Sequence, residues 1–181
     1  MKQYLIEESP FSYFFTADTR SAWLWLIVRL YLGWNWLEAG WEKLHNPVWA
    51  GGNAGGALQG FVHGALTKTG GLHPDVQGWY ASFLTRYVLP HVFLWSNLVA
   101  WGEFLVGIAL ILGFLVGLSA FAGMFMNLNY MLAGTVSVNP IWFTIGIGLM
   151  LAWRVAGYWG ADRYVLPLLH RSIRPRSYPL T

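Results

Sequence analysis

The sequence predicts an all-α integral membrane protein: a four-helix bundle with a long, partly helical extracytoplasmic loop between its first and second helices. Charged residues make up only 10% of the 181 residues, whereas soluble domains usually carry about 25%. Four apolar stretches are long enough to cross a hydrocarbon core, which takes roughly 20 helical residues. Residues 1–181 are therefore expected to form a single transmembrane domain.

The four expected spans follow from where the apolar stretches begin and end. The 49 residues from His91 to Asn139 contain one charged side chain, Glu103, and their length suits two spans. Glycines at both ends of Gly113–Gly117 predict a tight turn, which makes the second and third helices antiparallel neighbours. Asn139-Pro140 predicts the start of the fourth span, with the asparagine as its cap. The spans expected are about 22–41, 91–112, 116–136 and 140–160.

The segment 45–89 is expected to form the outer loop, with two short amphipathic helices. In its first half, apolar side chains recur at helical spacing at Leu58, Phe61, Val62, Ala65 and Leu66. In its second half they form one stripe, at Val76, Tyr80, Phe83 and Tyr87. Two interpretations of this loop stay open: a packed cover without chemistry, and a lid or docking surface for a substrate.

Lysine and arginine counts predict the orientation. Four spans place both termini on one side, and cytoplasmic segments carry an excess of these residues. Six flank the outermost spans and three lie in the loop, so we expect a plasma-membrane protein with both termini cytoplasmic. The six are Lys2, Arg20, Arg163, Arg171, Arg174 and Arg176, and the three are Lys43, Lys68 and Arg86. The first 20 residues do not match a cleavable signal peptide, and their aromatic side chains suit the headgroup level.

Polar side chains at similar depth on four spans form the candidate site. Insertion of a charged side chain at the depth of the bilayer core costs at least about 2.5 kcal/mol, so such a residue usually has an ion-pair partner or a functional role. We expect Glu103 to pair with Arg29, Arg154 or both. One interpretation is a buried ion pair that only fixes helix register. The other is a pocket in which the arginines hold a quinone headgroup or small anion, Glu103 carries protons, and Asn127 and Tyr130 donate hydrogen bonds.

The first span has two distinct faces. Arg29, Gly33, Trp36 and Gly40 share one face at 100° per residue, whereas Glu38 lies on the opposite one. Gly33 and Gly40 allow a neighbouring helix to approach closely. Trp36 is a candidate for stacking on a planar ligand, with core packing as the alternative, and Glu38 is a candidate outward-facing proton carrier.

The absence of cysteine limits the chemistry. It excludes disulfides, thiolate nucleophiles, Cys-x-x-Cys redox pairs and cysteine-ligated iron–sulfur clusters. The histidines of the loop region, His45, His63, His73 and His91, have no metal-site spacing. No metal, haem or iron–sulfur cluster is therefore expected.

Several motifs resemble those of one membrane-protein family. The first span carries Val28–Gly33 and Trp36–Leu44, and the later spans carry Gly102-Glu103, Met126–Gly134, Asn139-Pro140 and Ala152–Gly157. In this order the motifs resemble the DoxX/DoxD family over nearly the whole chain. The similarity is greatest to the branch identified as the large, DoxD-type subunit of thiosulfate:quinone oxidoreductase.

The resemblance implies a four-helix membrane protein that works with a small partner subunit. In that family the complex oxidises thiosulfate to tetrathionate and passes the electrons to membrane quinone. The leading hypothesis is therefore a quinone-binding oxidoreductase subunit that contacts lipid, quinone and a small partner subunit or a second copy, and no nucleic acid. The alternative is a non-catalytic membrane scaffold subunit of a larger complex. The candidate catalytic residues are Glu103, Arg29 and Arg154, and the candidate quinone- or anion-binding residues are Asn127, Tyr130, Glu38 and Trp36.

Overall fold

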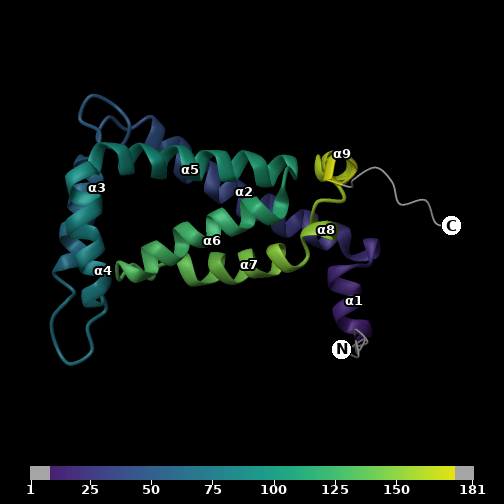
Figure 1. Cartoon of the computed structure of the whole chain (residues 1–181), viewed down its shortest axis with the longest axis horizontal. Coiled ribbons are helices and arrows are strands. Elements are labelled where there is room, and N and C mark those ends of the chain that lie inside the picture. Colours follow the sequence, from purple (N-terminus) through teal and green to yellow (C-terminus); the bar gives the residue numbers. More distant parts are fainter. Residues whose placement is uncertain (1–8, 174–181) are drawn as a thin grey trace.

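The structure, a computed structural model, describes residues 9–173, with side chains described as far as residue 169, and this range is helical without strands. Four helices lie lengthwise against one another (Figure 1). They are α2 (Ala22–Leu44), α5 (Val92–Leu112), α6 (Val116–Leu132) and α7 (Asn139–Leu151). The basic residues Lys2, Arg174 and Arg176, counted for orientation, lie outside the described residues.

Shorter helices lie at the two ends of these four (Figure 1). One end, here called the loop end, carries α3 (Gly56–Leu66) and α4 (Gly78–Phe83), which continues through a π-helical turn, Leu84–Val88, and a short 3-10 helix, Leu89–His91. The other, here called the terminal end, carries α1 (Pro10–Thr16), a 3-10 turn at Thr19–Ser21, α8 (Trp153–Ala156) and α9 (Asp162–Ile173). The two helices expected in the loop are thus present.

Glycines bring α2 and α5 close together. A Cβ atom on Gly40 would overlap the backbone of Phe104, and one on Gly107 would overlap the backbone of Leu37. A Cβ on Gly33 would lie 3.0 Å from the next turn of α5. The prediction that Gly33 and Gly40 admit a neighbouring helix is confirmed, and that neighbour is α5.

The turn between α5 and α6 lies where the sequence predicted it. Gly113 ends α5 in the left-handed region at φ 67°, and Leu115 precedes α6 at φ 46°. The buried carboxylate of Asp162 accepts hydrogen bonds from the backbone N–H groups of Leu115, at 2.6 Å, and Val116, at 2.8 Å. Burial raises the pKa of Asp162, although these two hydrogen bonds act in the opposite direction.

The fourth helix differs from the expectation in two respects. It is interrupted at Ala152 (φ −90°, ψ 16°), so α7 and α8 replace one continuous helix over 140–160. Asn139 is the first residue of α7 rather than its cap, which is Val138, and the side-chain amide of Asn139 donates to the carbonyl of Thr135 at 3.0 Å. Pro140 stands in the first turn as expected, where its missing N–H costs nothing.

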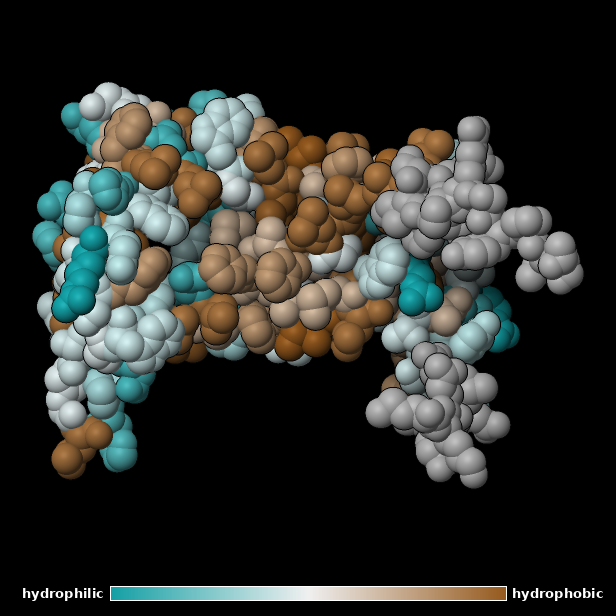
Figure 2. Space-filling view, viewed as in Figure 1, coloured by the Kyte–Doolittle hydropathy of each residue, from teal (hydrophilic) through white to brown (hydrophobic). Residues whose placement is uncertain are grey.

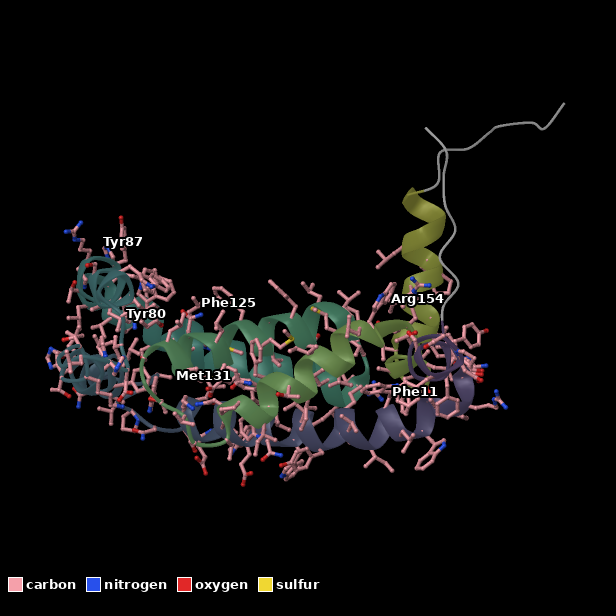
Figure 3. The ribbon with its side chains drawn as sticks, turned by 90° about the horizontal axis from the view of Figure 1, so that it is seen from below. Phe11, Tyr80, Tyr87, Phe125, Met131 and Arg154 are labelled. Carbon is pink, nitrogen blue, oxygen red and sulfur yellow. The ribbon has the colours of Figure 1, made fainter. Side chains whose placement is uncertain are left out.

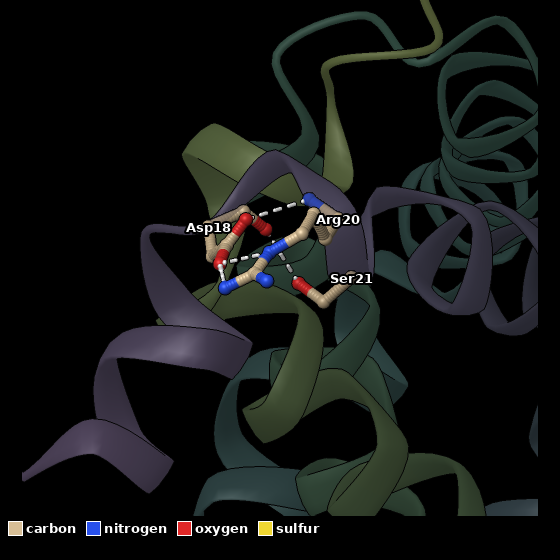
Figure 4. A network of polar contacts seen from close by, with 3 residues as sticks. All are labelled: Asp18, Arg20 and Ser21. Carbon is tan, nitrogen blue, oxygen red and sulfur yellow. Dashed lines mark hydrogen bonds and ion pairs between the residues drawn. The ribbon is translucent and has the colours of Figure 1, made fainter.

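A network of polar contacts fixes the turn from α1 into α2 (Figure 4). The Asp18 carboxylate accepts from the backbone N–H and Nε of Arg20, both at 2.8 Å, and Ser21 Oγ donates to the Asp18 carbonyl at 2.8 Å. The hydrogen bonds and charge of Arg20 hold the pKa of Asp18 below its ordinary value. Trp25 Nε1 donates to the carbonyl of Phe15 at 2.8 Å and ties α1 to α2.

The long helices expose an apolar belt between two more polar ends (Figure 2). Its exposed side chains include Trp34, Leu98, Leu105, Phe121 and Ile141. Within the described part of the chain, one helical stretch, Gly78–Leu112, is long and apolar enough to cross a membrane, and α6 and α7 are shorter apolar helices. Helix composition and length thus support one span directly, whereas four were predicted.

Candidate functional site

A buried carboxylate on α5 forms the centre of the candidate site. Glu103 is 2% exposed. Its Oε2 pairs with Lys43 Nζ from the end of α2 at 2.6 Å, and its Oε1 accepts a hydrogen bond from the Tyr130 hydroxyl of α6 at 2.6 Å. A charge removed from water needs an opposite charge and hydrogen bonds to be tolerated. Two helices, α2 and α6, supply these partners to the carboxylate on α5.

The expected pairing of Glu103 with Arg29 is wrong. Arg29 is 1% exposed, and its Nη2 donates to the carbonyl of Trp159 at 3.0 Å. Its guanidinium packs so closely against the backbone of Gly113 and Gly160 that a Cβ on Gly113 would overlap it. Glu103 and Gly113 are ten residues apart on α5, which corresponds to about 15 Å along the helix. Arg29 therefore contacts residues at the terminal end, far from the carboxylate of Glu103.

The expected pairing with Arg154 is also wrong. Arg154 is exposed, and its guanidinium lies over the ring of Trp153 at 5.3 Å from the centroid. It lies at the terminal end, whereas Tyr80 and Tyr87 lie at the loop end (Figure 3). The break at Ala152 begins a separate short helix here, which places Arg154 outside the bundle interior. The two arginines thus leave no surplus positive charge beside Glu103.

Two further candidate residues lie in the core. Asn127 and Trp36 are each 1% exposed. Among the described residues, neither polar atom of the Asn127 amide has a hydrogen-bond partner, and neither does Trp36 Nε1. Trp36 packs against Trp142 with 5.5 Å between ring centroids. Glu38, in contrast, is exposed on the outer face of α2. Of the seven candidates, Glu103 and Tyr130 are joined by a hydrogen bond, and Trp36 belongs to the buried cluster against which Tyr130 packs.

An apolar groove of about 460 Å³ opens beside Tyr130. It is formed by α3, the segment from α4 through the π-helical turn, α5 and α6. Its lining extends along α6 from Leu118 to Tyr130, twelve residues or about 18 Å of helix. Aliphatic side chains line it together with aromatic ones, which include Phe61, Phe83, Trp95, Phe121 and Phe125.

The groove is polar at one end only. Tyr130 and Asn129 line it where α6 ends, and Tyr80 closes this end from α4. The Tyr80 hydroxyl lies 3.0 Å from the Asn129 carbonyl and 3.1 Å from its Oδ1, and it donates to these oxygens. The other end, at Leu118 and Phe121, is apolar. Such a shape suits an elongated ligand with a small polar head and an apolar tail.

The sequence interpretation missed Lys43 and the groove. Lys43 was not among the candidate site residues, although it continues the buried face of α2 at helical spacing after Trp36 and Gly40. That spacing was the signal that marked it as inward-facing. Most of the groove's walls look like ordinary core residues, and only the packing of the loop helices on α5 and α6 leaves space between them.

The described residues contain no group of three histidine, cysteine or acidic side chains that would hold a metal ion. One family model, DoxD, described as "TQO small subunit DoxD", matches residues 24–171. No curated protein and no solved structure matches the chain. The expectation of a large subunit is not confirmed, because the family description names the small one.

Proposed function

The chain belongs to the DoxD family, and we propose that it is a membrane subunit that binds quinone. Together with a partner subunit, it couples oxidation of thiosulfate or a similar small sulfur anion to quinone reduction. In this proposal α2, α5, α6 and the α7–α8 pair cross the plasma membrane. The apolar belt of Figure 2 supports it, because exposed apolar side chains on all four helices favour a hydrocarbon surrounding.

The observation that carries the proposal is the polar end of the groove. An elongated apolar groove accommodates an isoprenoid tail, and the Tyr130 hydroxyl lies where the ring carbonyl would enter. Glu103 holds that hydroxyl at 2.6 Å and supplies a carboxylate for proton transfer. Trp36 belongs to the buried cluster against which Tyr130 packs, and the buried Asn127 lies one turn before Tyr130 on α6. Arg29 and Arg154 take no part in it, and we assign Arg29 to the stability of the terminal end.

The proposed reaction balances without a metal in this chain. Two thiosulfate anions that form tetrathionate release two electrons, and quinone takes up two electrons and two protons to become quinol. Because the chain has no cysteine, its contribution is to bind, orient and protonate. The partner subunit binds the sulfur anion or relays its electrons.

Blocking the groove tests this proposal. Ala122 lines the groove, so Ala122→Trp should fill it and reduce the quinone that copurifies with the gently extracted protein by at least about tenfold. Leu105→Trp is the matched control, because Leu105 is 56% exposed on α5 and does not line the groove. Mass spectrometry of bound quinone measures both variants. Equal quinone in both would place the binding site elsewhere.

A second candidate function, a non-catalytic scaffold, is favoured by the structural role of the charges at the terminal end. Arg29 binds the Trp159 carbonyl and Asp162 caps α6, so both hold helices together. A scaffold would copurify with its partner complex but without quinone. Its Glu103→Gln variant would lose thermal stability and leave electron transfer by the assembled complex unchanged.

A further inference from the structure

We propose that Lys43 and Glu103 form a proton entry route from the aqueous surface at the loop end to the Tyr130 hydroxyl in the groove. The proposal rests on the quinone function above and adds a residue, Lys43, and a direction to it. Protons consumed in quinone reduction would enter from the side that carries α3 and α4.

The three side chains form a continuous connection. The Tyr130 hydroxyl and Glu103 Oε1 are 2.6 Å apart, and Glu103 Oε2 and Lys43 Nζ are 2.6 Å apart. The Glu103 side chain is 3% exposed, whereas that of Lys43 is 21% exposed. The route thus begins at a group that meets solvent and ends at a group that lines the groove. Lys43 also lies over the ring of Trp49, 5.3 Å from its centroid, which holds it near the carboxylate.

No comparable connection enters from the terminal end within the described part of the chain. Between Glu103 and that end, the buried face of α5 presents Val106, Gly107 and Leu110. Beyond them lies the buried guanidinium of Arg29, whose positive charge disfavours the approach of a proton. Among residues 9–169, the titratable groups that bond to Glu103 are Lys43 from α2 and Tyr130 from α6.

Each proton transfer begins and ends with the same protonation of the three side chains. As one electron arrives from the sulfur anion, the Tyr130 O–H bond breaks and an O–H bond forms on the quinone oxygen. A proton then passes from the Lys43 ammonium through Glu103 to the Tyr130 oxygen, and water at the loop end restores the ammonium. This round supplies the proton on the ring oxygen beside Tyr130, one of the two that a quinol carries, and all three side chains return to their starting state.

Substitution of Lys43 by arginine separates proton transfer from structure. Arginine keeps the positive charge and the ion pair, but it does not release a proton at accessible pH. In Lys43→Arg we expect thiosulfate-driven quinol formation to fall at least about tenfold, with the dissociation constant for a short-chain ubiquinone within twofold of wild type. Lys68→Arg is the matched control, because Lys68 is a loop-end lysine that donates to the Gly134 carbonyl instead. It should retain the wild-type rate.

The direction is measured in the unmodified complex, purified with its partner and reconstituted in vesicles with a trapped pH dye. Protease cleavage near Leu72, which is 96% exposed, reports which way the loop end faces. We expect the loop-end compartment to lose at least one proton per quinol formed. Alkalinisation of the other compartment alone, or a wild-type rate in Lys43→Arg, would overturn the proton route while quinone binding stood. Absence of quinone binding in wild type would overturn the proposed function itself.

Discussion

Glu103 is a buried carboxylate, and each of its two oxygens has its own partner. Lys43 neutralises its charge and Tyr130 satisfies the second oxygen, at 2.6 Å each. Removing one partner of a buried pair leaves an uncompensated polar group, which costs more than the interaction contributes on its own. Each of the three residues is therefore expected to be sensitive to substitution.

Tyr130→Phe tests this dependence. The change removes only the hydroxyl and leaves Glu103 Oε1 buried without its hydrogen bond. We expect a loss of about 1–3 kcal/mol in the free energy of unfolding, measured by denaturant titration in detergent. Tyr87→Phe is the control, because Tyr87 is 61% exposed, and it should change stability by less than about 0.5 kcal/mol. Equal effects would show that the hydroxyl of Tyr130 has no special structural role.

Asp18 gives a prediction for pH. Its pKa lies below the ordinary value of 3.8, mainly because the Arg20 side chain hydrogen-bonds the ionised form. The carboxylate therefore stabilises the turn between α1 and α2 above pH 3.8, and this contribution is lost as the pH falls through the lowered pKa. We expect the indole N–H resonance of Trp25, which reports its bond to Phe15, to shift only below pH 3.8. In Asp18→Asn this acid transition should disappear.

At the scale of elements, glycine contacts between α2 and α5 set the register that decides which charges meet. Gly40 lies against Phe104, and Gly107 lies against Leu37. With the two helices antiparallel in this register, Lys43 meets Glu103, and Arg29 meets the end of α5 at Gly113. Any shift of one helical turn would separate the ion pair by about 5.4 Å.

Gly107→Ala should disturb this contact. The added methyl group would overlap the backbone of Leu37, so the helices must separate, and we expect a loss of about 1–3 kcal/mol. Gly64→Ala on α3 is the matched control, since nothing lies within 4 Å of the position its Cβ would take. It should be neutral or stabilise by up to about 1 kcal/mol through helix propensity. Thermal unfolding in detergent compares the two; equal stability would show that the α2–α5 contact tolerates a methyl group.

The whole molecule has an apolar middle and two ends that carry different polar clusters. The loop end carries the polar end of the groove and the Glu103 cluster. The terminal end carries Arg29 and Asp162, which join α2, α5, α6 and the segment after α8. Four membrane crossings would place these two ends on opposite sides of the bilayer.

Single cysteines test that placement, because the chain has none of its own. Leu72 is 96% exposed at the loop end and Tyr164 is 71% exposed at the terminal end. A membrane-impermeant maleimide should label Leu72→Cys in intact cells and Tyr164→Cys only after permeabilisation. Leu149→Cys, at a buried position, should stay unlabelled in both. Labelling of the first two from the same side would contradict the four-span arrangement.

Much of the fold follows from local patterns in the sequence. The turn at Gly113, the two loop helices, the inward face of α2 and the proline-started fourth helix all depend on residues near in the chain. The break at Ala152 was not predicted, because no proline or glycine marks it. The site was predicted only in part. Glu103 and Tyr130 come together as expected, but the prediction that Arg29 and Arg154 join them, made from their similar depth in the expected spans, was wrong.

The sequence by itself determined the helical class, the apolar character and the exclusion of cysteine chemistry. These properties depend only on which residues are present and how they are spaced, because each residue has its own transfer free energy and backbone preference. Only the tertiary structure decided that Lys43 neutralises Glu103, that Arg29 holds the terminal end, and that a groove opens beside Tyr130. These outcomes depend on the axial register of α2 against α5. That register comes from backbone contacts at Gly40 and Gly107, between residues more than sixty positions apart in the chain.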